Sequence, residues 1–334
     1  MLDNPALLPS RPVISEAMEW GRGHVRQVRD LSPDIRLFEI EPAGDFVPPT
    51  PGSHFNIGVQ INGRPDVRNY SALVFGTDGL YRIAVKRLPD SRGGSAYMWG
   101  LLPGAQLMIS TPGNHFELAR GRSEYLLLAG GIGITPIFTM GAALAEAAAN
   151  FRLLYAVRRR EDLALANDLQ QRIGNRLEVF VSSEGRRVDI AAEIAGLGHD
   201  GEFYVCGPIG MLEDAKREWQ RNGRPVDQLR FETFGNSGRF ASEQFKVKIP
   251  RLSREIDVPV NKTMLDALES AGVEVIFDCR KGECGLCALP ILDVEGMVDH
   301  RDVFFSQEEK AANTKLCTCV SRVIGSITVD TADR

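Results

Sequence analysis

The chain has 334 residues, of which 43% are hydrophobic and 25% charged, and its formal net charge is −5. This composition is typical of an ordinary globular protein, and the length exceeds the size at which one hydrophobic core keeps growing, so we expect two or three domains. The sequence contains no apolar run long enough to span a bilayer and no block of Lys or Arg suited to a phosphate backbone, which excludes membrane and nucleic acid as partners.

The first 20 residues lack a basic flank followed by an apolar segment, so no signal peptide is predicted and the chain is expected to be cytoplasmic. We also expect it to be a monomer. The cysteines are unevenly placed, because Cys206 stands alone and the other five follow residue 278. In a cytosolic chain such clustering favours metal or redox chemistry over disulfide bonds.

The first part of the chain, residues 1–122, is predicted to form a small antiparallel β-barrel. Apolar and polar side chains alternate through residues 24–60, as in IRLFEIEP and HFNIGVQI, and further short strands follow in YSALVF and LYRIAVKRL. Glycine and proline turns separate these strands, and the longest helix is expected around residues 94–101. This pattern is typical of a barrel.

The pattern changes at Tyr125, and residues 123–234 are predicted to form an α/β domain. Four continuous apolar runs, YLLLAG, FRLLYAV, LEVFVS and EFYVCG, are each followed by a predicted helix. The helices are expected at residues 135–148, 160–172, 189–195 and 209–221. Strands buried on both faces that alternate with helices indicate a parallel, doubly wound sheet.

The last part of the chain begins after a predicted linker at residues 235–244, where small and polar residues show no periodicity. Beyond it, in residues 245–334, FKVKI and EIDVPV predict a hairpin, and TMLDALESAG predicts an amphipathic helix closed by Gly272. Residues 241–334 carry 16 acidic and 12 basic side chains, a balance of −4. This balance suggests the hypothesis that an acidic surface docks on a basic patch of a partner.

Three cysteines in DCRKGECGLCA, Cys279, Cys284 and Cys287, have the spacing C-x₄-C-x₂-C, and Cys317 and Cys319 follow later. This is the spacing of plant-type [2Fe–2S] proteins, in which four thiolates hold two irons. The alternative is a structural zinc in a non-catalytic binding protein, although zinc sites usually contain two C-x₂-C pairs. Spacing alone leaves the fourth thiolate open, because Cys317 and Cys319 would share one face of an extended strand.

Two glycines in the same loop, Gly282 and Gly285, have a predicted role beside the cysteines. A loop that wraps a cluster must turn sharply, and its backbone N–H groups must approach the sulfides closely. Side chains at these two positions would obstruct both. We therefore expect the glycines to be as necessary as the thiols.

Glycine-rich turns mark the α/β domain as a candidate nucleotide site. In LLLAGGIGITPI (126–137) glycines follow a buried strand and begin a helix, where backbone N–H groups can bind a phosphate, and CGPIGM (206–211) is a second such turn. The carboxyl ends of parallel strands are where open α/β sheets bind ligands. The arginines at 158–160 follow the second strand, near an expected adenosine ribose, and leave the choice between NADH and NADPH open.

In the barrel, RNYSA (68–72) and SRGGS (91–95) are the candidate ligand-binding motifs. An aromatic ring and a hydroxyl beside an arginine suit a flat ring system, and a Gly-Gly turn that leads into a helix suits a terminal phosphate. Each motif alone is also an ordinary surface feature.

In combination the motifs resemble the phthalate dioxygenase reductase family, within the wider ferredoxin–NADP⁺ reductase superfamily. The resemblance covers about residues 23–330 and rests on RNYS, AVKR, SRGGS, AGGIGITP, YVCGP, FETF, DCRKGECGLC, VDHRD and CTCVSR, in that order. It implies an FMN-binding β-barrel, an NAD(P)-binding α/β domain and a plant-type [2Fe–2S] ferredoxin domain with an α+β β-grasp fold.

The resemblance also implies the site residues. The flavin would be contacted by Arg68, Tyr70, Ser71, Val85 and Lys86, and its phosphate by Arg92, Gly93, Gly94 and Ser95. The nicotinamide end would contain Gly131, Thr135, Pro136, Cys206, Gly207 and Pro208, with Thr135 and Cys206 near hydride transfer and Phe231 as the aromatic near the flavin. The cluster ligands would be Cys279, Cys284, Cys287 and Cys319, which leaves Cys317 as an adjacent extra thiol.

The implied activity is that of the reductase component of a two-component oxygenase. Electrons would pass from NADH through FMN and the cluster to a terminal Rieske non-heme iron oxygenase that hydroxylates an aromatic ring or removes an O-methyl group. A cytochrome P450 or another monooxygenase is the alternative acceptor. No side chain is expected to act as general acid or base, and His300 is expected to be a surface or packing residue.

Overall fold

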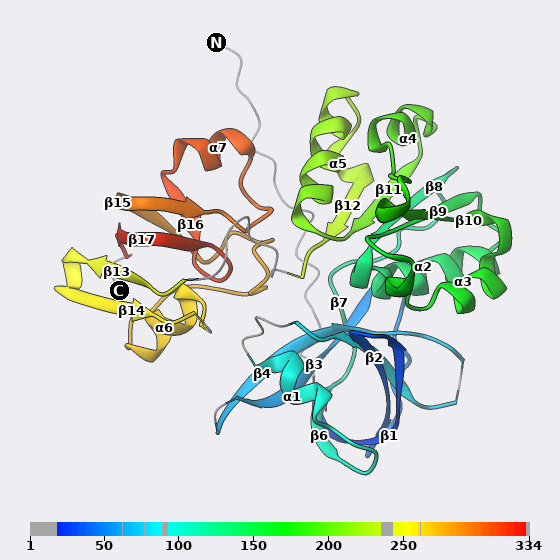
Figure 1. Cartoon of the computed structure of the whole chain (residues 1–334), viewed down its shortest axis with the longest axis horizontal. Helices are drawn as coiled ribbons and strands as arrows, with labels where there is room; N and C mark the ends of the chain where they lie inside the picture. The colour runs from blue at the N-terminus through cyan, green and yellow to red at the C-terminus, as the bar shows by residue number, and fades with distance from the viewer. Residues whose placement is uncertain are drawn as a thin grey trace.

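The chain folds around three separate sheets, which form three lobes in Figure 1. The computed structural model describes residues 19–61, 63–76, 78–88, 93–234, 243–260 and 262–331. Arg92 and most of the predicted linker, residues 235–242, lie outside the described residues. In the described part of the chain, no helix combines the length and the apolar character needed to cross a bilayer.

The first sheet is antiparallel, as predicted. Its strands are β1 (Trp20–Ser32), β2 (Ile35–Pro42), β3 (Ser53–Ile61), β4 (Arg64–Ser71), β5 (Tyr81–Lys86), β6 (Gln106–Ser110) and β7 (Gly113–Asn114). They lie in the order β4-β3-β6-β1-β2-β5, with β7 on β3, and a bridge between Leu73 and Arg82 joins the two ends. Alternating side chains such as Phe38, Ile57 and Ile83 fill the interior together with Met98 of helix α1 (Gly94–Trp99).

The second sheet is parallel, with the order β10-β9-β8-β11-β12. Its elements are β8 (Tyr125–Gly130), α2 (Ile134–Glu146), β9 (Phe151–Val157), α3 (Ala166–Ile173), β10 (Leu177–Val181), α4 (Ile190–Gly196), β11 (Glu202–Cys206), α5 (Ile209–Arg221) and β12 (Leu229–Glu232). Short 3₁₀ turns are η1 (Gly131–Gly133), η2 (Arg160–Asp162), η3 (Gly174–Arg176), η4 (Ser182–Glu184) and η5 (Val226–Gln228).

Two features of this region differ from the sequence prediction. The helix expected at residues 160–172 is interrupted between η2 and α3, because Leu165 has a φ of 62°, which an α-helix does not accommodate. The strand β12 was not predicted, since it is only four residues long. It is nevertheless important, because its end leads toward the third sheet.

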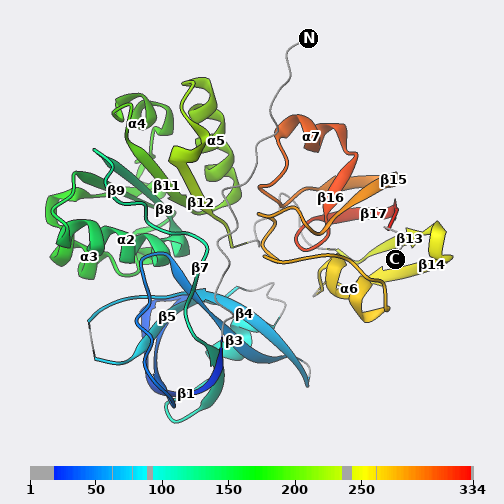
Figure 2. The ribbon, with the colours of Figure 1, turned by 180° about the vertical axis from the view of Figure 1, so that it is seen from behind.

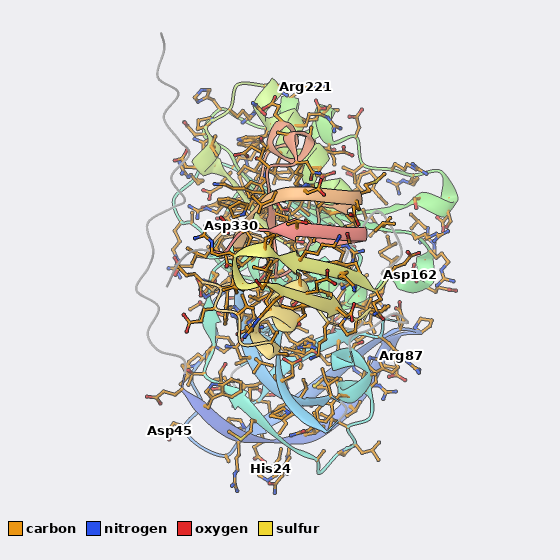
Figure 3. The ribbon with its side chains drawn as sticks, turned by 90° about the vertical axis from the view of Figure 1, so that its left-hand side faces the viewer. His24, Asp45, Arg87, Asp162, Arg221 and Asp330 are labelled. Carbon is orange, nitrogen blue, oxygen red and sulfur yellow. The ribbon has the colours of Figure 1, made fainter. Side chains whose placement is uncertain are left out.

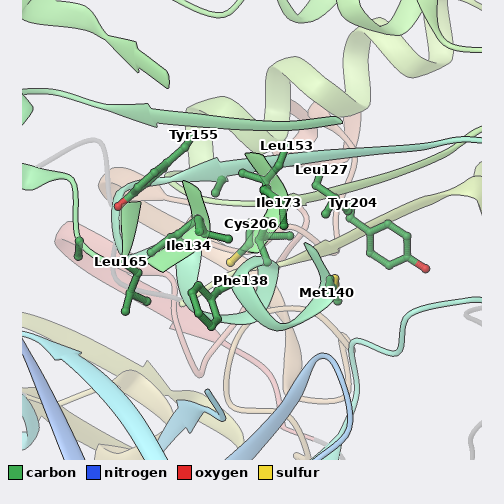
Figure 4. Close-up of a cluster of buried hydrophobic side chains, with 14 of the residues drawn as sticks. Leu127, Ile134, Phe138, Met140, Leu153, Tyr155, Leu165, Ile173, Tyr204 and Cys206 are labelled. Atoms are coloured by element: carbon green, nitrogen blue, oxygen red, sulfur yellow. The ribbon is translucent and has the colours of Figure 1, made fainter. Parts of the chain in front are cut away.

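Helix α2 is apolar on nearly all sides because it lies between the parallel sheet and the barrel. Its residues Ile134 and Phe138 belong to one buried cluster with Leu37 and Leu73 of the barrel region. Figure 4 shows this cluster, in which Cys206 lies among side chains of α2 and the neighbouring strands. This shared core holds the glycine turns that follow β8 and β11 against the barrel.

The third sheet is mixed, with β13 and β17 parallel and the other pairs antiparallel, in the order β14-β13-β17-β15-β16. Its elements are β13 (Phe245–Ile249), η6 (Pro250–Leu252), β14 (Arg254–Val258), α6 (Met264–Ser270), β15 (Ala288–Asp299), α7 (Gln307–Ala312), β16 (Lys315–Cys317) and β17 (Arg322–Val329). The predicted hairpin and helix are both present. Helix α6 begins with a Thr263–Asp266 capping box and is followed by Gly272 at a φ of 71°.

Two views show how the third sheet lies relative to the rest. In Figure 2, β15, β16 and β17 lie on the right, beside α5 and β12 of the parallel sheet. In Figure 3 this sheet faces the viewer, with the barrel residues His24 and Asp45 below it and Arg221 at the end of α5 above it. The loop with three cysteines, which connects α6 to β15, therefore belongs to a lobe that borders the parallel sheet.

Candidate functional site

The two glycine turns of the parallel sheet pack directly on each other. A Cβ on Gly133 would lie 2.2 Å from the carbonyl oxygen of Cys206, and a Cβ on Gly207 would lie 3.1 Å from Gly130. Only glycine permits this approach. Helix α2 has no side-chain cap at its N-terminus. The Ile134 N–H already donates to the carbonyls of Gly131 and Ile132, and Pro136 has no N–H, so phosphate binding at this turn stays a prediction.

The residues predicted at the nicotinamide end lie around these turns. Gly131 has a φ of 55°, and Pro136 is buried within α2. The Thr135 hydroxyl is buried and donates a hydrogen bond to the carbonyl of Ile132 at 3.0 Å. The Cys206 side chain is fully buried, and this burial raises the pKa of its thiol well above the usual value, so the thiol stays protonated.

The flavin motif of the barrel brings Arg68 to the Gly-Gly turn. A Cβ on Gly94 would lie 2.5 Å from Nε of Arg68, so the arginine side chain lies across this glycine. The Ser71 hydroxyl is buried and has no hydrogen-bond partner among the residues that the structure describes. Because buried polar atoms are nearly always paired, this orphaned hydroxyl fits a bound polar ligand such as a flavin ring.

The other predicted flavin residues differ in what their side chains contact. Tyr70 packs on the barrel core, and its burial raises the pKa of the phenol. Val85 points into that core, whereas Lys86 pairs with Asp34 at 3.2 Å. The Ser95 hydroxyl accepts a hydrogen bond from the Leu88 N–H at 3.3 Å. The side chain of Val85 is thus a packing group, and its carbonyl accepts a hydrogen bond from the Trp99 indole N–H at 3.1 Å.

A hollow of about 490 Å³ lies where the barrel meets the end of β9. It is lined by Asp34, Lys86, Arg158, Arg159 and Asp162. Arg159 is held in ion pairs with Glu161 and Asp162, and Arg160 pairs with Glu184 at 2.5 Å. Of the three consecutive arginines, Arg158 is therefore the one whose guanidinium lines the hollow without a described ion pair.

Phe231, predicted as the aromatic near the flavin, lies on the face of the parallel sheet opposite to α2. It is in register with Val205 on β11 and packs beside the Lys216 ammonium, 5.1 Å from the ring centre. Phe234 instead packs against the core shared by α2 and the barrel. Phe234 therefore lies on the barrel side of the parallel sheet, whereas Phe231 packs on the opposite side.

The cysteine loop and the residues around the end of β16 bring five thiols together in two groups, one of two and one of three. Cys279 and Cys284 are hydrogen-bonded to each other, and burial together with this contact raises the pKa of Cys279 to about 11. Cys287 receives hydrogen bonds from Cys317 and Cys319, which lower its pKa to about 3. Backbone N–H groups of Lys281 and Glu283 also donate to Cys279 Sγ, each at 3.4 Å. Two neighbouring groups of thiols, each with at least two members, fit a centre with two irons.

The predicted strand around Cys317 and Cys319 is wrong in part. Strand β16 ends at Cys317, and Cys319 lies in the turn that follows. The chain turns after Cys317, where the N–H groups of Val320 and Ser321 donate to the Cys317 carbonyl at 3.4 and 3.0 Å. Both the N–H and the hydroxyl of Thr318 in this turn donate to the carbonyl of Cys287, at 3.2 and 2.9 Å. Of Cys317 and Cys319, the Cys319 thiol alone also interacts with Cys279 and with the Gly282 N–H. Cys319 therefore connects the two groups of thiols.

The two loop glycines are required sterically, as predicted, although the close neighbours are different ones. Gly282 has a φ of 77°, and a Cβ there would lie 2.9 Å from Cα of Asp302. Gly285 has a φ of 74°, and its Cβ would lie 2.3 Å from the ring of Phe304. The glycines thus let the loop pack against residues 302–304.

A buried cluster of charges beside the loop was missed by the sequence reasoning. Lys281 Nζ lies 2.8 Å from Glu232 Oε1, and the Glu283 carboxylate accepts a hydrogen bond from the Thr233 N–H at 2.8 Å. Charged residues are normally solvent-exposed, and these partners are about 50 positions apart, so no local pattern could indicate them. His300 is buried and lies 2.9 Å from Asn313 Oδ1, which agrees with a packing role.

Two protein-family models match parts of this chain. Residues 247–323 match the 2Fe-2S iron-sulfur cluster binding domain, and residues 127–217 match the oxidoreductase NAD-binding domain. The described residues contain no group of three His, Cys, Asp or Glu side chains arranged to hold a single metal ion.

Three similar proteins extend over nearly the whole chain. It is 36% identical to the heme-dependent oxidative N-demethylase beta subunit of Ectopseudomonas mendocina, over 90% of this chain and 96% of that protein. It is 31% identical to the vanillate O-demethylase oxidoreductase of Acinetobacter baylyi, over 91% and 96%. The solved structure of phthalate dioxygenase reductase matches with a TM-score of 0.74 and 27% identity, over 93% and 98%.

Proposed function

Because this chain belongs to the phthalate dioxygenase reductase family of oxygenase reductase subunits, we propose that its electron acceptor is a Rieske non-heme iron oxygenase. The chain is an NADH-dependent oxidoreductase that carries FMN and a [2Fe–2S] cluster and serves the terminal component of an oxygenase. When bound, these cofactors supply hydride acceptance and transfer of single electrons. The protein supplies position and environment.

The proposed flavin site is the face of the barrel that meets α2. Arg68 and the Gly93–Gly94 turn would hold the phosphate, and the free Ser71 hydroxyl would bond to the ring. The remaining proposed contacts are Tyr70, Val85, Lys86 and Ser95. A hydrogen bond of 3.0 Å from the Thr139 hydroxyl to the Ala72 carbonyl ties α2 to this motif and so keeps the nicotinamide turn beside it.

The proposed nicotinamide site consists of Gly131, Thr135, Pro136, Cys206, Gly207 and Pro208. The protonated, neutral Cys206 and the apolar side chains of α2 would exclude water where hydride moves. No charged acid or base is needed there. The free Arg158 guanidinium would tolerate a 2′-phosphate, so NADPH is a possible second donor in this proposal.

The proposed cluster ligands are Cys279 and Cys284 for one iron and Cys287 and Cys319 for the other. The pairing of the thiols supports this assignment, and the contacts of Cys319 with Cys279 and Gly282 support it over Cys317. Structural zinc is less well supported, because residues 247–323 match the 2Fe-2S iron-sulfur cluster binding domain. The observation that carries the proposed function is this paired set of thiols in a loop that touches the end of the nicotinamide sheet.

The proposed acceptor can be tested directly. The protein, fully loaded with FMN and iron, is reduced with NADH without oxygen and mixed with purified Rieske oxygenases in a stopped-flow instrument. We expect at least one Rieske centre to be reduced at a rate that supports turnover. Cys284→Ser protein serves as the control, because it keeps the flavin site and loses a proposed iron ligand.

A heme protein is the second candidate acceptor, because the relative from Ectopseudomonas mendocina is named as a subunit of a heme-dependent demethylase. Reduction of a heme oxygenase in the same experiment, with no reduction of any Rieske centre, would favour this candidate.

We also place the protein in the cytoplasm, where NADH is the donor and thiols stay reduced, and expect it to act as a monomer.

A further inference from the structure

The cysteine loop and the last strand of the nucleotide region are joined by a buried ion pair between Lys281 and Glu232. The side chains are 14% and 4% exposed, and their charged atoms lie 2.8 Å apart. A buried pair contributes little net stability, because removing two charges from water costs about as much as their attraction returns. The best-attested use of such pairs is to fix one arrangement of two elements, since any other arrangement leaves a charge buried alone.

A second contact lies next to the first. The Glu283 carboxylate accepts a hydrogen bond from the Thr233 N–H at 2.8 Å. Two loop residues, Lys281 and Glu283, therefore hold two consecutive residues at the end of β12. Two contacts of this kind fix the orientation of the loop as well as its distance from the strand.

The same two loop residues hold the sulfur of Cys279. Their backbone N–H groups each donate to Cys279 Sγ at 3.4 Å, while their side chains extend to β12. At the other end, Glu232 is in register with Cys206, at the proposed nicotinamide site. A continuous set of contacts thus connects Cys206 with a proposed iron ligand.

The Lys281 ammonium also lies close to the barrel. His54 on β3 is buried and is in register with Ser71 of the flavin motif, and its Nδ1 has no hydrogen-bond partner in the described part of the chain. Burial first, and then the nearby positive charge of Lys281, lower the pKa of His54 to about 3. The imidazole is therefore neutral, and the charge of Lys281 acts on the barrel as well as on β12.

We propose that Lys281 and Glu283 are positioning residues that hold the cysteine loop at one distance from the flavin and thereby set the rate of electron transfer from flavin to cluster. The redox consequence rests on the proposed function. The mechanical part, a loop held by β12, does not depend on it.

The disruptive variants are Lys281→Met and Glu283→Leu, and the conservative variants are Lys281→Arg and Glu283→Gln. Glutamine keeps an acceptor for the Thr233 N–H, and arginine keeps the charge that pairs with Glu232. The matched control is Arg280→Met, which removes a positive charge from the neighbouring residue. Arg280 pairs with Asp266 and Glu269 of α6, within the same lobe.

Two measurements test the proposal on protein whose FMN and iron contents have been verified. The first is hydrogen exchange in peptides that cover residues 229–234 and 279–287. The disruptive variants should exchange faster than the control and the conservative variants. The second is stopped-flow reduction by NADH, in which flavin reduction should keep its rate while cluster reduction slows by about tenfold or more, since small displacements of reacting groups carry large kinetic costs.

Unchanged exchange and unchanged cluster reduction in the disruptive variants would overturn the proposal. It would also be overturned if Lys281→Arg and Glu283→Gln lost as much as the disruptive pair, because the contacts would then not be the cause. If even the wild-type cluster were not reduced through the flavin, the proposed function would fail, and the exchange measurement would still decide whether β12 holds the loop.

Discussion

The steric demands of the cysteine loop allow a quantitative prediction for Gly282→Ala. An alanine there must adopt a φ near 77°, which costs an L-residue about 1–2 kcal/mol. Its Cβ would also lie 2.6 Å from Cγ2 of Val320 and 2.9 Å from Cα of Asp302, and overpacking of this kind costs about 1–3 kcal/mol. The total predicted loss in free energy of unfolding is about 2–5 kcal/mol.

Two other glycines provide the comparison. Gly272 has a φ of 71°, and the nearest atom to its Cβ would be Arg254 Nη1 at 4.0 Å, so Gly272→Ala tests the backbone cost alone. At Gly285 the obstacle is the ring of Phe304, which is 43% exposed and can move outward. We therefore expect Gly282→Ala to be the most destabilising of the three.

The assay is guanidinium unfolding of the iron-loaded protein, followed by the loss of visible absorption from the cluster. The iron content of each variant is measured beforehand. A Gly282→Ala protein as stable as Gly272→Ala would refute the reasoning, because the close contacts with Val320 and Asp302 would then carry no cost.

Three further predictions concern the cofactors and the acceptor. Cys319→Ser should abolish the cluster absorption, whereas Cys317→Ser should retain it; the reverse result would exchange the two assignments. Ser71→Ala should weaken FMN binding by up to about tenfold in a fluorescence titration of flavin-free protein, since one hydrogen bond contributes about 1 kcal/mol; unchanged affinity would remove Ser71 from the site. If acidic residues of the last 94 positions guide docking, the rate of acceptor reduction should fall as salt rises to physiological ionic strength, and a flat profile would contradict this.

The three-part architecture could be predicted because each part has its own periodicity. Alternation in the barrel, continuous apolar strands in the α/β region and the C-x₄-C-x₂-C spacing are all local patterns. The need for Gly282 and Gly285 was also predictable, because a loop that turns sharply requires glycine. The positive φ values of both residues agree with this. The atoms that a side chain would meet there, in Asp302 and Phe304, come from a loop that no local pattern indicates.

The remaining errors share one physical cause, which is contact between residues distant in sequence. Cys319 lies in a turn after β16, and Thr318 of that turn bonds to the carbonyl of Cys287, 31 positions earlier. Phe231 and Phe234 stand in one motif, and only their packing against distant residues shows that Phe234 lies toward the barrel. Lys281 and Glu232 are both charged, and the sequence pattern alone places them in solvent.

The central claim, that electrons leave through a cluster held by the cysteine loop, is tested most directly by Cys284→Ser. NADH oxidation is measured with an artificial dye that accepts electrons from the flavin and, separately, with the cognate oxygenase. The account predicts that the variant loses its iron and its reduction of the oxygenase, while dye reduction continues at the wild-type rate. Reduction of the oxygenase by iron-free variant would contradict it.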